Sequence, residues 1–304
     1  MAEAPALSTG VSDHPARGRR NWVPYALLAP GLLFLFVFFV TPMIPLFSQS
    51  LQEGSVEEGY TFTGNVSVYI DALQTYWSHL LRSIGYAATA TAVSLLLGYP
   101  LAYFIAQKAG RWKNVVLILV IAPFFTSFLI RTLAWRTILS DTGPVTDFAQ
   151  AIGFTSLLQA VGLTETDTLL ASKFAVICGL TYNFLPFMIL PLYASLERLD
   201  PRLVEAAGDL YASPWESFRR VTWPLSLPGV VAGTLLTFIP AAGDLINSRL
   251  LGNTQTIMIG QVIDAQFLRV LDYPLAAALS FVLLILIVTL VALYVRRAGT
   301  EELV

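Results

Sequence analysis

The chain has 304 residues, of which 56% are hydrophobic and 12% are charged, about half of the ~25% charged share that is usual in soluble domains. This composition excludes a soluble globular domain and predicts a polytopic membrane protein. The net charge of −2 excludes a polybasic nucleic-acid-binding protein, the single Cys178 excludes an internal disulfide framework, and His14 and His79 are too few for a metal cluster.

The N-terminal part of the chain combines a polar tail with a long apolar run. Residues 1–21 are small and polar and end in several arginines, which predicts a disordered cytoplasmic tail. A signal peptide is the alternative, but the apolar run that follows is too long and lacks a small-residue cleavage site. Residues 23–47 carry no charge and predict the first membrane span, with bends expected at Pro30, Pro42 and Pro45.

Five further apolar stretches are long enough to cross a bilayer, which takes about 20 residues. We expect these spans at about 80–106, 114–139, 170–196, 225–245 and 273–295. The intervening segments 48–79 and 140–170 together carry eight acidic residues and no lysine or arginine. In the second of these segments, the apolar patches 148–152 and 157–161 predict a short helix that lies over the membrane surface.

Basic residues mark one side of this six-span arrangement. Twelve of the 18 lysines and arginines fall in the N-terminal tail, in the loops after the second and fourth spans, and directly after the sixth span. Because cytoplasmic loops carry an excess of basic residues, both termini are expected in the cytoplasm. The sequence therefore predicts an all-α fold with a tail at 1–21, a six-helix membrane domain at 22–297 and a cytoplasmic C-terminus at 298–304.

A polar interruption between the fourth and fifth spans predicts a first short helix. Asp200 can cap this helix and Pro201 occupies its first position, where the missing N–H of proline is not needed. Leu203, Ala207 and Leu210 follow at helical spacing and form one apolar face.

A second short helix is predicted after a break at residues 211–212. Ser213 and Glu216 have the spacing of a capping box, and Pro214 again occupies the first helical position. Two prolines, Pro224 and Pro228, are expected to end the unit. Such a polar helix–turn–helix belongs in water, and the positions of the basic residues place it in the cytoplasm.

The spacing within this unit resembles the EAA loop of ABC-importer permeases, which reads Glu-Ala-Ala, three residues, Gly, nine residues, Ile, one residue, Leu, Pro. The matching residues are Glu205, Ala206, Ala207 and Pro224, while Val221, Trp223 and Tyr211 replace the Ile, the Leu and the Gly. Glycine allows a left-handed turn at that position. A tyrosine there either reshapes the turn or adopts the left-handed conformation at a free-energy cost of roughly 1–2 kcal/mol.

The resemblance implies that residues 200–224, called the coupling loop below, contact an ATPase subunit. The residues expected at the contact are Leu203, Glu205, Ala206, Ala207, Asp209, Leu210, Tyr211, Ala212, Ser213 and Pro224. The chain has no G-x-x-x-x-G-K-[ST] sequence, so we expect no cofactor on it, with ATP and Mg²⁺ on the separate ATPase. It also lacks a Ser-His-Asp set and a zinc signature, and we do not expect an enzyme.

Three longer segments are similar to the B-type permease subunits of spermidine/putrescine importers. They are APFFTSFLIRTLAW at 122–135, NFLPFMILPLYASLERLD at 183–200 and GQVIDAQFLRVLDYPLAAALS at 260–280. The resemblance spans nearly all of 24–297 and implies a type I ABC-importer permease fold in a bacterial inner membrane. It also implies a dimer of ATPase subunits, a second homologous permease and an extracytoplasmic substrate-binding protein as partners. A heterodimer of permeases is expected, and a homodimer remains open.

Polar residues within the predicted spans are candidates for the substrate pathway. A charge at the bilayer centre costs roughly 2.5–3.5 kcal/mol, so Arg131 either faces a pathway or reaches the outer interface, as we expect of Arg136. Asp244 either lines the route of a cation or pairs with Arg249. The candidate set is Arg131, Trp135, Tyr182, Asn183 and Asp244, in which Tyr182 and Asn183 mark either a pathway or an interhelical hydrogen bond.

The acidic outer segments favour an organic cation, so a polyamine is the expected substrate. Permeases that this chain resembles also serve opines, phosphonates, iron and sulfate, and these remain alternatives. An ion-coupled secondary transporter is a further alternative, but it would have inverted repeats and coupling carboxylates at the midplane. Gly229 and Gly233 form a G-x-x-x-G sequence, which allows close packing of two helices in a membrane.

Overall fold

The computed structural model describes residues 23–298 and divides the chain into two compact units, up to Leu46 and from Phe47 onward. The predicted tail 1–21 and the C-terminal segment from 299 lie outside the described residues. Within them, five helices are long and apolar enough to cross a membrane, and a pair of helices bent by 95° supplies a possible sixth crossing. The predicted all-α membrane fold is confirmed.

The first unit is helical, as predicted for the first span. Helix α1 (Val23–Leu35) passes through the π-helical segment η1 (Phe36–Val40) into α2 (Thr41–Gln49). The wide π turn comes directly before Pro42, whose ring and missing N–H disfavour a regular α turn at this point. The helix of the first span therefore continues through Pro30, Pro42 and Pro45 without interruption.

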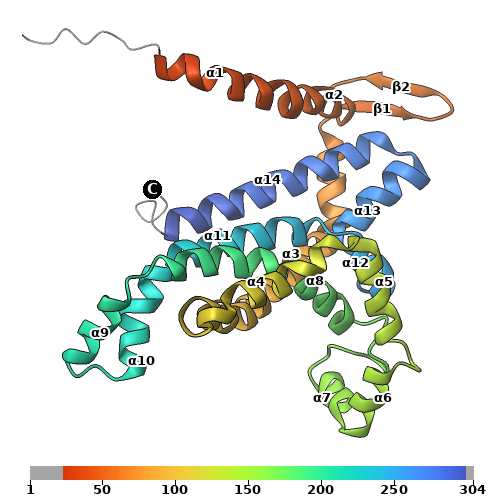
Figure 1. The fold of residues 1–304 in the computed structure, drawn as a ribbon. Helices are drawn as coiled ribbons and strands as arrows, with labels where there is room; N and C mark the ends of the chain where they lie inside the picture. The colour runs from red at the N-terminus through yellow and green to blue at the C-terminus, as the bar shows by residue number, and fades with distance from the viewer. Residues whose placement is uncertain (1–22, 299–304) are drawn as a thin grey trace, which may run out of the picture. The chain divides into compact units, whose positions relative to one another are not determined.

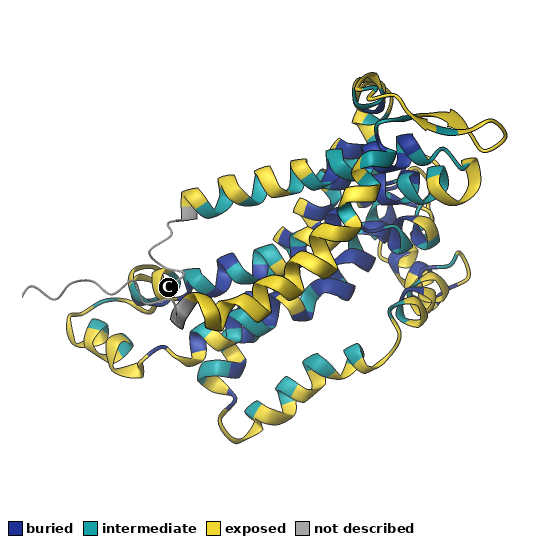
Figure 2. Cartoon of the chain, turned by 90° about the horizontal axis from the view of Figure 1, so that it is seen from above, coloured by how far each residue is buried: buried dark blue, intermediate teal, exposed yellow. Residues whose placement is uncertain are grey.

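Long helices form the core of the second unit (Figure 1). They are α3 (Ser67–Tyr103), α8 (Lys173–Glu197), α11 (Trp223–Ala242) and α14 (Tyr273–Ala298). Helices α3, α8 and α11 pack against one another, and α14 packs against α3 and α11. Buried residues concentrate along these contacts, whereas the outward faces of the helices are exposed, as Figure 2 shows. Exposed apolar helix faces of this kind are compatible with lipid or with other membrane helices.

Two glycines bring α11 into close contact with α8. A Cβ atom on Gly229 would lie 2.6 Å from Cβ of Ser195 and 2.8 Å from the carbonyl oxygen of Pro191. A Cβ atom on Gly233 would lie 2.8 Å from Sδ of Met188. Neither position accepts a side chain unless α8 moves, so the close packing predicted for the G-x-x-x-G sequence is confirmed.

The second span begins earlier than predicted, because residues 67–79, which we expected in an outer loop, are the first turns of α3. Ala72 and Leu80 are buried among residues of α14 and of α13 (Ile259–Ala265), and this tertiary contact extends the helix beyond its apolar run. An antiparallel hairpin that was not predicted, β1 (Gln52–Ser55) and β2 (Gly59–Phe62), precedes α3. At its other end α3 continues into η2 (Phe104–Lys108), followed by η3 (Gly110–Trp112).

The third span, predicted at about 114–139, is helical but interrupted by a sharp bend that was not predicted. It consists of α4 (Lys113–Ile121), η4 (Ala122–Phe125) and α5 (Phe128–Ile138), with a bend of 95° between the second and third pieces. The backbone N–H and the hydroxyl of Thr126 both donate to the carbonyl of Pro123, at 3.1 and 2.7 Å. These local hydrogen bonds replace a helical turn, which is how a threonine ends a helix inside an apolar run.

Segments expected as loops also contain short helices. The surface helix predicted within 140–170 is two helices, α6 (Pro144–Ala151) and α7 (Phe154–Ala160), separated by Gly153 with a φ of 72°. The loop predicted before the last span contains α12 (Ile246–Leu251), α13 and η6 (Gln266–Val270). Leu251, Met258 and Ile259 are fully buried, so packing rather than local propensity stabilises this segment.

The contact of α11 with α8 generates a stability prediction. We expect Gly229→Ala to lower the free energy of unfolding by about 1–3 kcal/mol, because the new methyl group overlaps α8. The measurement is the thermal unfolding midpoint of the purified protein in detergent. The matched control is Gly85→Ala on α3, where a Cβ atom meets nothing within 4 Å. Equal midpoints for the two variants would contradict the proposed close contact.

Candidate functional site

The predicted helix–turn–helix is present, with both of its predicted caps. In α9 (Pro201–Asp209), the carboxylate of Asp200 accepts the N–H of Arg202 at 3.0 Å. In α10 (Pro214–Ser217), the Glu216 N–H donates to the Ser213 hydroxyl at 3.3 Å, and the Ser213 N–H donates back to the Glu216 carboxylate at 3.0 Å. These reciprocal bonds are the capping box that the spacing predicts.

The second helix of the unit does not end at Pro224 and Pro228, and that prediction is wrong. Helix α10 continues through the π-helical segment η5 (Phe218–Thr222) directly into α11. The Trp223 N–H donates to the Phe218 carbonyl, five residues back, and this wide turn accommodates the ring of Pro224 within a continuous helix. The coupling loop is consequently joined to the core by unbroken helix.

The turn between the two helices keeps the left-handed geometry that glycine normally provides. Tyr211 has a φ of 61°, and its N–H donates to the Gly208 carbonyl at 2.9 Å. The Ala212 N–H donates to the Ala207 carbonyl at 3.0 Å. This pair of bonds is a Schellman motif, which satisfies the last carbonyls of α9. The strained turn is therefore retained with a tyrosine, rather than reshaped.

Apolar side chains of the coupling loop point into solvent. Helix α9 has no buried residue, and Leu210 and Tyr211 are 81% and 97% exposed. Trp215 is 67% exposed, with its ring stacked on that of Phe218 at a centroid distance of 5.5 Å. The remaining predicted contact residues lie on the surface or at its edge: Leu203, Glu205, Ala206, Asp209, Ser213 and Pro224 are exposed, and Ala207 and Ala212 are half-buried.

Sequence analysis missed Trp215. The available signal was a large aromatic residue inside a polar segment, where no apolar periodicity accounts for it. Exposed clusters of large apolar residues are uncommon on free protein surfaces and mark contact sites. The exposed set of Leu210, Tyr211 and Trp215 therefore belongs with the predicted contact residues.

The inner side of the coupling loop is fixed to the core. Trp223, which stands where the EAA pattern has leucine, packs on the ring of Tyr99 at a centroid distance of 5.3 Å. The hydroxyl of Tyr99 bonds that of Ser226 at 2.8 Å, and Leu199 is buried. The amide of Gln107 donates to the Leu196 carbonyl at 2.8 Å. Contacts from α3 and η2 thus hold both ends of the helix–turn–helix.

Asn183, a candidate pathway residue, joins three helices. Its Nδ2 donates to the hydroxyl of Thr132 on α5 at 3.1 Å and to Oδ1 of Asn247 on α12 at 3.0 Å. Asn183 is 1% exposed, so this amide lies in the interior. The interhelical hydrogen bond, one of the two expectations for this residue, is present.

The other candidates occupy different surroundings. Trp135 and Tyr182 lie with ring centroids 5.5 Å apart and line one apolar groove of about 410 Å³ between α3, α5 and α8. The guanidinium of Arg131 lies over the rings of Phe124 and Phe128, at 5.2 and 5.7 Å. The structure thus brings together two of the five candidates in one groove, and Arg131 is not among the residues that line it.

Asp244 does not pair with Arg249, which was one of its two expected roles. Arg249 instead pairs with Asp264, with 2.7 Å between Nη2 and Oδ2. Asp244 follows the end of α11, and its carboxylate accepts the N–H and the Nδ2 of Asn247 at 2.8 and 3.2 Å. It is buried, and it connects to Asn183 through Asn247.

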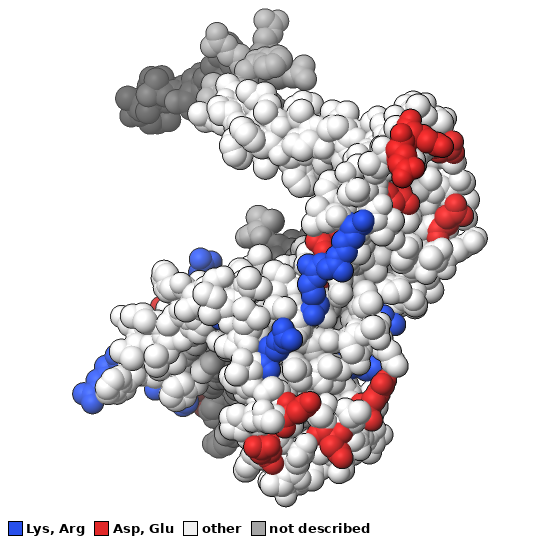
Figure 3. Space-filling model, turned by 90° about the vertical axis from the view of Figure 1, so that its right-hand side faces the viewer, with Lys and Arg blue, Asp and Glu red and all other residues white. Residues whose placement is uncertain are grey.

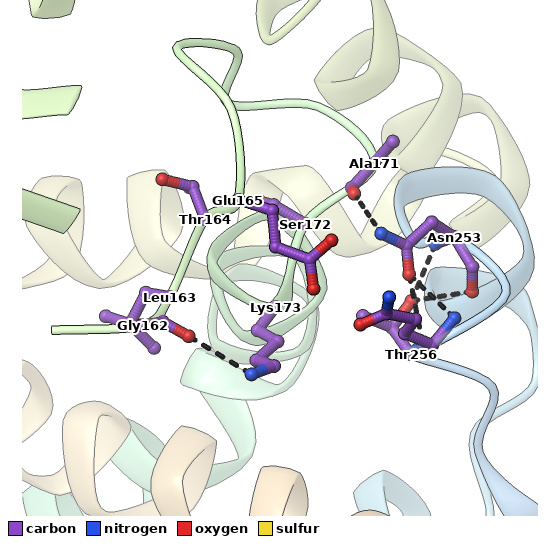
Figure 4. A pocket seen from close by; sticks show the side chains of 10 residues that line it. Gly162, Leu163, Thr164, Glu165, Ala171, Ser172, Lys173, Asn253 and Thr256 are labelled. Carbon is purple, nitrogen blue, oxygen red and sulfur yellow. Dashed lines mark hydrogen bonds between the residues drawn. The ribbon is translucent and has the colours of Figure 1, made fainter. Parts of the chain in front are cut away.

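A small polar pocket lies between the loop before α8 and the loop after α12 (Figure 4). The ammonium of Lys173 donates to the Gly162 carbonyl at 3.1 Å, and Nδ2 of Asn253 donates to the Ala171 carbonyl at 2.8 Å. Its volume of about 10 Å³ is that of a single water molecule. The hydrogen bonds beside the pocket link segments on its two sides, and the cavity is too small for an organic substrate.

A family model described as the binding-protein-dependent transport system inner membrane component matches residues 94–298. The spermidine/putrescine transport system permease protein of Escherichia coli K12 is 38% identical over 270 residues, which are 88% of this chain and 94% of that protein. The protein of the same description from Haemophilus influenzae is 34% identical over 277 residues, 91% of this chain and 90% of that protein.

Two solved structures share the fold. One is a bacterial ABC transporter involved in the import of the acidic polysaccharide alginate, with a TM-score of 0.59 at 20% identity over 92% of this chain and 96% of the matched chain. The other is the alginate transporter in complex with a periplasmic protein bound to an alginate pentasaccharide, with a TM-score of 0.62 at 20% identity over 93% and 96%.

The strained turn at Tyr211 generates a second prediction. We expect Tyr211→Gly to stabilise the turn by about 1 kcal/mol, because glycine adopts the left-handed conformation without the Cβ penalty. The measurement is hydrogen exchange at the Ala212 amide, which should slow by roughly fivefold. The control is Tyr211→Ala, which removes the ring but keeps Cβ. Equal slowing in both variants would assign the effect to the ring rather than to the backbone.

Proposed function

Because the chain belongs to the family of binding-protein-dependent transport system inner membrane components, we propose that it forms half of the substrate pathway of an ATP-driven importer. The observation that carries this proposal is the coupling loop, a doubly capped helix–turn–helix with exposed apolar side chains and an unbroken helical connection to α11. In this role the chain is a transporter subunit and not an enzyme. ATP and Mg²⁺ are bound by a separate ATPase, since this chain has no phosphate-binding loop.

The coupling loop acts as a rigid lever between the ATPase and the membrane helices. Leu203, Ala206 and Leu210 of the first helix enter a cleft of the ATPase, where the small alanine side chain permits close approach. Glu205 pairs with a basic group of the partner. When two ATPase subunits close around ATP, the loop moves with them, and its motion reaches α8 and α11 as rigid-body rotation of packed helices.

The remaining loop residues complete this contact. Tyr211 and Trp215 extend the apolar surface at the tip of the loop, with Asp209, Ala207, Ala212, Ser213 and Pro224 at its edges. A desolvated aromatic centre with a polar rim is the usual arrangement at a protein interface. This orientation requires the loop and both termini on the cytoplasmic side of the inner membrane, as the distribution of basic residues predicts.

We propose a polyamine, or a related organic cation, as the substrate. The relatives described as spermidine/putrescine permeases support this substrate, and so does the charge of the outer segments. Acidic side chains gather in patches on one face of the molecule (Figure 3). Glu53, Glu57 and Glu58 lie in the β1–β2 hairpin, and Asp141, Asp147, Glu165 and Asp167 lie in α6 and in the loops before α6 and after α7. Opines, phosphonates, iron and sulfate are the alternatives. The fold is no guide to the charge of the substrate, since the alginate transporter with this fold imports a polyanion.

Within the membrane, Trp135 and Tyr182 present aromatic rings along one groove, which suits the methylene chain of a polyamine. Arg131, Asn183 and Asp244 are the polar residues of the same proposed pathway. A second, homologous permease supplies the other half, and an extracytoplasmic binding protein delivers the substrate. A heterodimer of permeases is proposed, and the composition of the purified complex distinguishes it from a homodimer.

The assignment of the coupling loop is tested with Ala206→Asp. We expect this variant to lose the ATPase, because docking would desolvate a new carboxylate at the contact. The measurement is a mild-detergent pull-down of the tagged chain, with mass spectrometry of the proteins that co-purify. The control is Ala160→Asp, the same substitution at an exposed alanine of α7. An ATPase that co-purifies equally with Ala206→Asp and wild type would remove Ala206 from the interface.

The transport function is tested in proteoliposomes that contain the purified complex and its binding protein. We expect uptake of labelled putrescine only with ATP on the ATPase side. Excess unlabelled spermidine should compete, whereas sulfate or a phosphonate should not. Uptake without ATP but with a sodium or proton gradient would refute the importer and favour an ion-coupled carrier.

A further inference from the structure

Arg131 places a positive charge inside the protein without an ionic partner. Its side chain belongs to α5, and the nitrogens Nε and Nη1 are buried and have no hydrogen-bond partner among the described residues. Neither of the ion pairs within residues 23–298 includes Arg131. A charge in the interior of a membrane protein usually pairs with an opposite charge or lies on the path of a charged solute, so the position of this residue needs an explanation.

Aromatic ring faces hold the guanidinium of Arg131. Its central carbon lies 5.2 Å from the ring centroid of Phe124 and 5.7 Å from that of Phe128. Both distances are within the ~6 Å over which a ring face attracts a cation. A guanidinium is suited to such contacts because it is weakly hydrated and planar. The two rings therefore form a cation site, and the guanidinium that fills it shows that the site has room for a cation.

The two rings belong to a larger aromatic cluster that joins α5 to α8. Phe124 contacts Phe187 with ring centroids 5.0 Å apart, and Phe128 contacts Phe184 at 5.9 Å. The centroids of Phe184 and Phe187, both on α8, are 6.2 Å apart. Phe124 lies in η4 and Phe128 is the first residue of α5, so the cation site lies at the 95° bend of the third span.

The cation site is one helical turn from the apolar groove described above. Arg131 and Trp135 are four residues apart on α5, which places their side chains on the same face of the helix. Trp135 lines the groove together with Tyr182, and none of the described residues that line it is charged. The groove suits methylene groups but offers no partner for the charged end of an amine. The neighbouring ring faces supply that partner.

We propose that Phe124 and Phe128 form a site for an ammonium group of the transported substrate, and that Arg131 occupies this site until the substrate displaces it. This inference rests on the proposed transport of an organic cation and extends it by naming where the charged end is received. An alkylammonium and a guanidinium are both attracted by ring faces, so one can replace the other.

The contacts of Arg131 allow such an exchange. In this position Nε and Nη1 form no hydrogen bonds with described residues, and a displaced guanidinium regains hydrogen bonds because a long arginine side chain can extend to the membrane interface. A site on a transport path must also release its ligand. Ring faces without a carboxylate meet this condition, because they attract a cation without forming an ion pair with it.

The cation site has a mechanical connection to the coupling loop. Helix α8 carries Phe184 and Phe187 and ends at Glu197, shortly before the coupling loop begins. When the ATPase moves the loop, these rings shift against those of Phe124 and Phe128. The site then offers a cation different contacts in the two states of the transporter, which is the condition for coupling binding to a conformational change.

The first test measures inhibition of putrescine uptake by tetramethylammonium, in complexes reconstituted with the same binding protein. We expect Arg131→Gln to lower the half-inhibiting concentration by about tenfold, because the probe no longer competes with a resident cation. Arg131→Lys, which keeps a cation beside the rings, should be inhibited like wild type. The control is Arg136→Gln, the same change at an exposed position of α5. Equal inhibition of Arg131→Gln and wild type would overturn the displacement of Arg131.

A direct binding measurement is independent of transport. Para-fluorophenylalanine at position 124 reports on the ring through its fluorine resonance in the purified complex in detergent. We expect tetramethylammonium to shift this resonance, with a half-saturating concentration about tenfold lower in Arg131→Gln than in wild type. The same label in place of Phe148, an exposed ring of α6, should not respond. A resonance at position 124 that saturating tetramethylammonium leaves unchanged in wild type would overturn the cation site, whether or not Arg131→Gln assembles.

The two measurements separate the cation site from the proposed substrate. Wild-type complexes that transport neither putrescine nor spermidine, but whose resonance at position 124 responds to tetramethylammonium, would refute polyamine transport and support the cation site. ATP-dependent uptake of putrescine without any response at position 124 would support the importer and overturn the cation site.

Discussion

The contact between α8 and α11 is the constraint on which the rest of the structure depends. These two helices flank the helix–turn–helix, and Gly229 and Gly233 of α11 leave room for Ser195 and Met188 of α8 to lie directly against the α11 backbone. Because protein interiors are close-packed and deform little, a force on the loop moves the pair together rather than bending one helix away from the other. The contact of Trp223 with Tyr99 extends this packed unit to α3, so three of the long helices are linked by close contacts to the helix–turn–helix.

The features that were predicted correctly are those determined by neighbouring residues in the chain. Asp200, Ser213 and Glu216 cap their helices through bonds that span two or three residues, so spacing alone is sufficient. Most of the long apolar runs were correctly predicted as helical membrane spans for a similar reason. In a bilayer, the backbone N–H and C=O groups must form their hydrogen bonds within the segment itself. The close packing at Gly229 and Gly233 of α11 was also predicted from neighbouring residues, but the sequence did not identify α8 as the helix they contact.

The features that were missed depend on contacts distant in sequence. The extra turns of α3 are stabilised by α13 and α14, and the helices between 246 and 270 by burial of Leu251 and Ile259. The 95° break in the third span follows from hydrogen bonds of Thr126, which an apolar average conceals. In the candidate site, the exposure of Trp215 and the partner of Asp244 could not be predicted from sequence, since exposure and the competing pair of Arg249 with Asp264 are properties of the folded chain.

The π-helical turn at Phe218–Thr222 has a consequence for how this loop can vary in length. A π turn contains one residue more than the α-helix needs, and each residue of an α-helix advances the direction of the following side chains by about 100°. Loss of a single residue here would let a regular α turn replace the wide one, and the loop would keep nearly the same direction about the axis of α11 because the wide turn already absorbs the extra residue. A single-residue deletion in the regular part of α11, by contrast, would turn the loop about the helix axis by about 100°.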